Sequence, residues 1–135
     1  MEYLLNLDRR LSHLLTMPFI YAIFFAILFL DICIELYQHI CFPVYRIPLV
    51  PRGEYIRIDR HKLQYLNIFQ KMNCMYCGYV NGFLRYAVEI GAKTEQYWCA
   101  IKHKEMPEKS FRKPKHQEAF MNYDDKETFN NFKNK

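Results

Sequence analysis

The sequence lacks a cleavage site for a signal peptidase, a nucleic-acid-binding motif and an even number of cysteines. Basic residues precede the apolar run that starts near residue 17, but no small-residue site follows it, so we expect an uncleaved anchor. Five cysteines, two of them in the apolar run, do not form a secreted disulfide framework and indicate a reducing compartment. The net charge of +5 suits anionic lipid headgroups, and we expect no nucleic acid as a partner.

The length of 135 residues is too small for two cored domains together with a membrane segment. Hydrophobic residues make up 51% of the chain, yet the mean hydropathy is -0.25, so apolar and charged residues are segregated. We predict a mainly α protein with one N-terminal membrane helix, a small helical cytoplasmic domain rich in cysteine and histidine, and a polar C-terminal tail.

The apolar block covers residues 17–45. From Met17 to Leu30 it holds 14 residues without a charge, too few on their own to cross about 30 Å of hydrocarbon at about 1.5 Å per residue. A span must therefore include Asp31 and Glu35, and one helix over 18–42 would be about 37 Å long. A tilted or partly interfacial helix is also consistent with this pattern.

Arginine predicts the orientation of this anchor. Five basic residues follow the span within about 20 positions, against Arg9 and Arg10 before it, so the carboxyl side is expected to be cytoplasmic. A membrane-dipping hairpin with both ends inside remains an alternative, because both flanks carry arginine. The residues predicted to lie at the membrane interface are Arg46, Arg52, Arg57 and Arg60.

Changes in composition along the chain divide it into five predicted segments. Prolines, a glycine and short alternating segments after the anchor indicate an extended connector, whereas the last residues lose periodicity and alternate in charge. The predicted parts are an amphipathic N-terminal segment (1–16), a membrane anchor (17–45), a surface connector (46–61), a Cys/His helical domain (62–103) and a flexible polar tail (104–135).

A C-x2-C…C-x3-H array predicts a metal site. Two cysteines in a tight turn can share one ion, and a cysteine and a histidine four apart lie on one helical face. The ligand set is Cys74, Cys77, Cys99 and His103, for which zinc is the expected metal and iron the alternative.

The length of the intervening helix counts against this site. A helix from an N-cap at Asn81 to Cys99 would be about 27 Å long, so the two halves meet only if the helix breaks, for which Gly91 is the candidate, or if the chain before it doubles back. A thiol pair without metal and inert core cysteines are the alternatives.

Asp31, Glu35 and His39 recur every four residues and would form one polar edge of a helix. Ionisable residues inside a membrane are rare and point to function, so a catalytic metal site is one interpretation. The other interpretation is that the edge lies at the interface, where Arg57, Arg60 or lipid headgroups neutralise it.

The strings NCMYCGYVNG and TEQYWCAIKH, with the preceding ELYQHICFPVYRIPLVPRGEYIRIDRHKLQYLN, resemble a family of small uncharacterised bacterial membrane proteins. The shared patterns are a C-x-Y-C-x-Y-x-N-G knuckle and an E-Q-Y-W-C-x-I-K-H end, within residues 31–103. The resemblance implies a bacterial membrane protein and no particular activity.

Two functions fit these features. The first is a noncatalytic, membrane-anchored accessory or assembly protein with a structural Cys/His metal site, located in the bacterial inner membrane and binding lipids and another membrane protein. The second is a membrane-bound metalloenzyme that uses Asp31, Glu35 and His39 on a lipid or quinone-like substrate.

Overall fold

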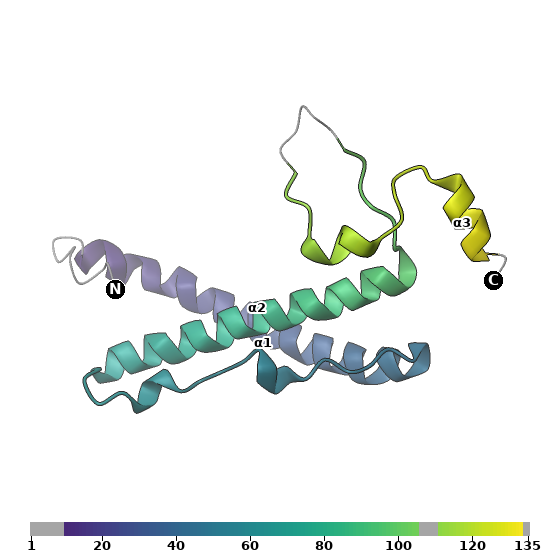
Figure 1. Cartoon of the computed structure of the whole chain (residues 1–135). Helices are drawn as coiled ribbons and strands as arrows, with labels where there is room; N and C mark the ends of the chain where they lie inside the picture. Colours follow the sequence, from purple (N-terminus) through teal and green to yellow (C-terminus); the bar gives the residue numbers. More distant parts are fainter. Residues whose placement is uncertain (1–9, 106–110, 134–135) are drawn as a thin grey trace. The chain divides into compact units, whose positions relative to one another are not determined.

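The computed structural model describes residues 10–105 and 111–133. Its elements are α1 (Arg10–Tyr45), η3 (Arg52–Glu54), η4 (Arg60–Lys62), α2 (Ile68–Trp98), η5 (Lys115–Ala119) and α3 (Lys126–Lys133), drawn in Figure 1. The predicted mainly helical fold is confirmed. The chain forms two compact units, one ending at Ala87 and the other beginning at Val88. Residues 1–9 of the predicted amphipathic segment and 106–110 and 134–135 of the predicted tail lie outside the described part.

Helix α1 is longer than the predicted anchor. It begins at Arg10, so its uncharged part runs over residues 11–30, which is 20 residues and about 30 Å. A span without Asp31 and Glu35 is therefore also long enough, because the helix extends back past Met17, and the residues that cross a membrane stay a prediction. Among the described residues, α1 is the one helix long and apolar enough to cross a membrane.

The end of α1 is set by its backbone. Arg46 has a φ of 58°, in the left-handed region, and the amide of Ile47 donates to the carbonyl oxygen of Phe42 at 2.9 Å. This is the hydrogen bond of a Schellman motif, which closes a helix by satisfying a free carbonyl. Pro48 follows directly and prevents the helix from continuing.

Helix α2 begins with a capping box. The side-chain oxygen of Asn67 accepts from the amide of Gln70 at 2.9 Å, and the Gln70 side chain accepts from the amide of Asn67 at 3.0 Å. The predicted helix start at Asn81 is wrong, since Asn81 lies inside α2 and its side-chain amide donates to the carbonyl oxygen of Cys77. Nor does α2 break at Gly91.

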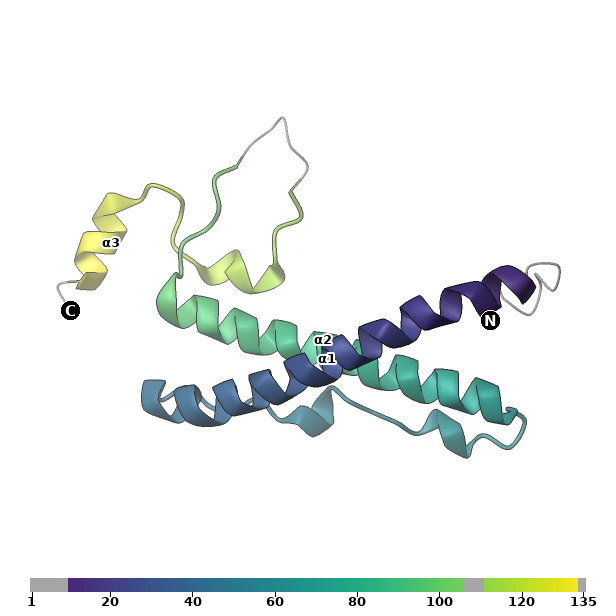
Figure 2. The same ribbon diagram turned by 180° about the vertical axis from the view of Figure 1, so that it is seen from behind.

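The connector between α1 and α2 returns along both helices. Val50 contacts the second half of α1, and Ile58 lies beside Tyr21 and Phe24 in its first half. As a result α1 and α2 run in the same direction through their contacts, from Tyr76 beside Ile20 to Tyr86 beside Gln38. Figures 1 and 2 show the two helices crossing and diverging toward their first residues.

Glycines in α2 let the connector approach closely. A Cβ atom at Gly82 would lie 2.7 Å from the carbonyl oxygen of Tyr55, and one at Gly78 would lie 2.9 Å from that of Arg57. Real Cβ atoms do not approach so closely, so the connector backbone occupies the space that side chains would fill. The fully buried Phe42, Phe83 and Tyr86 form the core of this unit.

The second unit joins the end of α2 to the C-terminal segment. A parallel bridge pairs Ile101 with Met121, and Asp125 caps α3 by accepting from the amide of Thr128 at 3.0 Å. The sequence predicted no regular structure over 104–135, whereas residues 111–133 contain η5 and α3. Local capping and the bridge order a segment whose composition is that of a tail.

Candidate functional site

A polar cluster on the inner face of α1 is the most elaborate arrangement in the first unit. Asp31 is 7% exposed, although it is a carboxylate on an apolar helix. Arg52 of η3 donates from Nη2 to Oδ2 of Asp31 at 2.6 Å and from Nη1 to Oδ1. Tyr79 of α2 donates its hydroxyl to Oδ2 of the same carboxylate at 2.6 Å. Both oxygens of Asp31 are therefore engaged by groups from two other segments.

Glu35, one turn further along α1, shares this arginine. Nη1 of Arg52 donates to Oε1 of Glu35 at 2.8 Å, and the hydroxyl of Tyr86 donates to the same oxygen at 2.9 Å. Gln38 completes the chain, because its amide nitrogen donates to the Tyr86 hydroxyl at 2.8 Å while its carbonyl oxygen accepts from the amide of Val50 at 2.8 Å. The network thus fastens α1 to both the connector and α2.

His39, the third residue of the predicted polar edge, touches this network only at Glu35. Its side chain is 59% exposed, and its Nδ1 atom lies 2.9 Å from the carbonyl oxygen of Glu35 and 3.4 Å from Oε2. The structure therefore brings Asp31 and Glu35 together through Arg52 and leaves His39 at the edge. Neither Arg57 nor Arg60 forms the predicted neutralising contact; Arg52 forms it instead.

The electrostatics follow from these contacts. Hydrogen bonds to Asp31 and Glu35 raise the pKa of Arg52 above its ordinary value, so this residue stays charged. Burial, followed by hydrogen bonds to Glu35, raises the pKa of Tyr86 to about 12. Burial and the hydrogen bond to Asp31 likewise raise the pKa of Tyr79 to about 12. Both tyrosines therefore remain neutral donors to carboxylates over the physiological range.

The network borders a shallow hollow of about 360 Å³. Its walls are Asp31, Glu35 and Arg52 together with the apolar side chains of Ile32 and Leu36. Two carboxylates and one guanidinium leave one formal negative charge there, so the hollow suits a cationic or hydrogen-bond-donating group. No proton-transfer role follows from Asp31, because three hydrogen bonds already hold its two oxygens.

The predicted metal ligands lie in different surroundings. Cys74 and Cys77 are on α2 rather than in the expected turn, whereas Cys99 and His103 follow the end of that helix. All five cysteines are free. Within residues 10–105 and 111–133, no three histidine, cysteine, aspartate or glutamate side chains are grouped to hold a metal ion. The structure does not gather the four ligands, and zinc or iron binding by them stays a prediction.

The four arginines predicted to lie at a membrane interface have separate positions. Arg46 ends α1, Arg52 belongs to the polar network, Arg57 meets Gly78 through its carbonyl oxygen, and Arg60 starts η4. Their contact with lipid headgroups stays a prediction.

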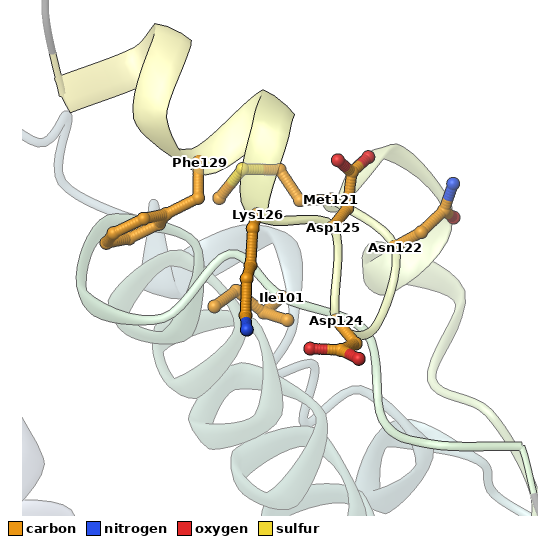
Figure 3. Close-up of a pocket in the computed structure, with 7 residues that line it drawn as sticks. All are labelled: Ile101, Met121, Asn122, Asp124, Asp125, Lys126 and Phe129. Atoms are coloured by element: carbon orange, nitrogen blue, oxygen red, sulfur yellow. The ribbon is translucent and has the colours of Figure 1, made fainter.

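A second hollow, of about 240 Å³, lies in the C-terminal unit. Figure 3 shows its lining side chains, which come from both sides of the isolated bridge, the following turn and α3: Ile101, Met121, Asn122, Asp124, Asp125, Lys126 and Phe129. In the same unit, Glu95 pairs with Nε2 of His116 at 2.6 Å and accepts from Gln117 at 2.6 Å. These contacts position η5 on the end of α2.

Comparison with protein-family models, curated proteins and solved structures found no match to this chain. The resemblance to a bacterial membrane protein family therefore stays a prediction from its motifs.

Sequence reasoning missed four members of the polar network: Arg52 as its cation, and Gln38, Tyr79 and Tyr86 as its hydrogen-bonding partners. A signal for Gln38 was present, since it lies seven residues after Asp31 and three after Glu35 and therefore shares their helical face. The tyrosines repeat at the same interval of seven on α2. Two facing stripes with this spacing are a signal for a polar contact between the helices.

Proposed function

We propose that this chain is a noncatalytic accessory protein anchored in the bacterial inner membrane by α1, with its C-terminal part in the cytoplasm. The observation that supports the anchor is the outer face of α1, where large apolar side chains recur at helical spacing and are left exposed. Phe25, Phe29, Ile32, Leu36 and Ile40 are between 56% and 71% exposed. Large apolar side chains left exposed along one face of a helix are typical of a membrane or protein interface.

The inner face of α1 strengthens the proposal. The carboxylates Asp31 and Glu35 point to the connector and α2, where Arg52 neutralises part of their charge. Only 11% of the most apolar 18 consecutive residues of α1 is buried, whereas the core helix of a water-soluble protein is mostly buried, and this low burial supports the anchor. Polar groups are thus withdrawn from the surface that would meet lipid.

The polar network supports a structural role over catalysis. Asp31 and Oε1 of Glu35 accept hydrogen bonds from Arg52, Tyr79 and Tyr86, all of which tie the connector and α2 to α1. An assembly protein needs such a rigid unit to present a constant surface, and the partner we propose is another membrane protein. The predicted structural zinc site belongs to this proposal.

One observation favours the alternative of a membrane-bound metalloenzyme acting on a lipid or quinone-like substrate. The hollow beside Asp31 and Glu35 is open and is bordered by the apolar Ile32 and Leu36. If Glu35 is a metal ligand, Glu35→Gln will lose bound metal while Glu89→Gln keeps it. Equal metal contents in the two variants would rule out this alternative.

The anchor is tested by extraction of membranes with alkaline carbonate and high salt. We expect the full chain to stay in the pellet and to be released only by detergent. Phe29→Asp places a charge on the outer face of α1 and should increase the released fraction, whereas Phe132→Asp, at an equally exposed phenylalanine of α3, should not. Release of the unaltered chain by salt alone would contradict the anchor.

A further inference from the structure

The stripe of α2 that packs on α1 continues past the contact between the helices. Ile68, Met72, Met75, Tyr79, Phe83 and Tyr86 follow one another at intervals of three or four residues and therefore share one face. At the C-terminal end of this stripe, Phe83 and Tyr86 are fully buried. At the other end Ile68 is 75% exposed, Met72 52% and Met75 42%. One continuous apolar face is thus half covered and half open.

The uncovered half borders a groove of about 360 Å³. Its α1 wall is formed by Tyr21, Phe24 and Leu28, its α2 wall by Met72, Met75, Tyr76 and Tyr79, and Ile58 of the connector adds to it. All eight side chains are apolar or aromatic. Its lining residues belong to the part of α2 that precedes Tyr86 and to residues 21–28 of α1, and the ribbons of the two helices diverge toward their first residues in Figures 1 and 2. Its volume falls within the range of small-molecule sites, about 300–1,000 Å³.

Contacts between the helices show which residues of α1 lie beside this groove. The hydroxyl of Tyr76 donates to the carbonyl oxygen of Ile20 at 3.0 Å, and the hydroxyl of Tyr21 donates to Oδ1 of Asn73 at 3.3 Å. The ring of Phe24 lies 5.7 Å from that of Tyr79. These residues of α1 belong to its uncharged run, residues 11–30. Whatever medium surrounds that run must also meet the groove.

The part of α2 that lies beside the uncharged run of α1 is itself uncharged. No charged residue lies between Lys71 and Arg85, a stretch of 13 residues, residues 72–84. Before it, Arg60, Lys62 and Lys71 place three cations around the start of the helix. Cations flanking an uncharged helical segment complement anionic headgroups, and lysine can extend its ammonium toward the interface while its stem stays in apolar surroundings.

We propose that acyl chains of bilayer lipids fill this groove, so that the first turns of α2 are a second membrane-contacting element beside α1. This inference rests on the proposed anchoring of α1 and adds to it the ligand class and the residues that contact it. Lipid chains are the occupant because Leu28 of the groove wall is itself one of the exposed apolar side chains of α1 and the whole lining is apolar or aromatic.

The test uses the single tryptophan of the chain. In a Trp98→Phe background, tryptophan is introduced at Met72 in the groove, at Phe29 on the outer face of α1, or at Asn81, an exposed polar position of α2. Each full-length variant is reconstituted into vesicles of phosphatidylglycerol and phosphatidylethanolamine, with or without bromine on the acyl chains. Bromine quenches tryptophan fluorescence only at short range, so quenching reports acyl-chain contact.

Strong quenching at Phe29 and Met72, about twofold or more above that at Asn81, is expected if both side chains contact acyl chains. Quenching at Phe29 alone would overturn the groove proposal and leave the anchor standing. No quenching at either position would overturn both. Ile68→Trp repeats the test on the same stripe should Met72→Trp fail to fold. A dimer that protects Met72 from brominated lipid would assign the groove to a second copy and contradict the proposal.

Discussion

The guanidinium of Arg52 binds Asp31 through both of its terminal nitrogens, across 21 residues of sequence. This contact joins η3 to the middle of α1 and places a cation beside a carboxylate that is almost fully buried. The bidentate geometry orients the guanidinium relative to the carboxylate in addition to neutralising its charge, because each nitrogen donates to a different oxygen. Arg52 therefore holds the connector on α1 together with the hydrogen bond between Val50 and Gln38.

Arg52→Met is expected to destabilise the first unit. The change leaves Asp31 without its counter-charge, which costs about 3–5 kcal/mol for fully buried pairs and about 1–3 kcal/mol here, since Arg52 is 39% exposed. Thermal unfolding in detergent micelles measures the loss. Arg57→Met is the control and should shift the midpoint little, whereas adding Asp31→Asn to Arg52→Met should recover part of the loss. A midpoint equal for both arginine variants would contradict a structural role for this pair.

Gly82 and Gly91 provide a matched pair on one helix. Gly82→Ala would bring a methyl group against the backbone of Tyr55 and Ile56, so it should displace the connector and destabilise by about 1–3 kcal/mol. A Cβ atom at Gly91 would meet no heavy atom within 4 Å, so Gly91→Ala should gain about 0.5–1 kcal/mol of helix propensity. Unfolding midpoints that move in opposite directions would support this packing, and a neutral Gly82→Ala would show that the connector does not pack there.

The contact of Glu95 with His116 predicts acid sensitivity in the second unit. Hydrogen bonds from His116 and Gln117 lower the pKa of the Glu95 carboxyl below its ordinary 4.5. A depressed pKa stabilises the fold above the ordinary value, and this stabilisation is lost as the pH falls through the folded-state pKa. The protection of residues 115–119 against hydrogen exchange, relative to their intrinsic rates at each pH, should therefore decrease below about pH 4.5. Glu95→Gln should abolish most of this acid dependence, whereas Glu118→Gln should preserve it.

Metal analysis tests the predicted zinc site. If Cys74, Cys77, Cys99 and His103 bind one ion, purified protein will contain about one equivalent of zinc, and Cys99→Ser will lose it. Cys33→Ser, which alters a cysteine outside the predicted set, should retain the metal. Because the described residues form no such group, binding requires a conformation different from this one. Purified protein free of zinc and iron, prepared without chelator, would contradict the prediction.

Much of the first helix could be predicted because its signal is local. A long apolar run favours a helix whatever its surroundings, and the predicted helix over 18–42 lies within α1, which ends at Tyr45. The start of α2 was missed although its signal is also local, since Asn67 and Gln70 form a capping box with an amide in place of the usual carboxylate. In the sequence alone, Asn81 and Gly82 resemble a helix start. The structure gives Gly82 a different role, because the connector backbone lies against it.

The polar site could be predicted in part. Helical spacing identified Asp31 and Glu35 as neighbours and identified their need for a cation. The choice of Arg52 over Arg57 or Arg60 depends on the path of an irregular connector, which no periodic pattern encodes. The pairing of Glu95 with His116 depends in the same way on a fold-back of the C-terminal segment.

The packing of α1 on α2 means that α1 is synthesised well before its contacts on α2. Asp31 meets Tyr79, 48 residues later in the chain, and must exist without this partner while the connector is made. At about 5–20 residues per second, translation takes about 2–10 s to supply that tyrosine. Until then Asp31 lacks the hydroxyl of Tyr79, so the polar network that joins α1 to α2 can be completed only after the first turns of α2 have been made. The sequence of α1 is thus synthesised completely before Tyr79, the residue of α2 that completes the hydrogen bonds of Asp31.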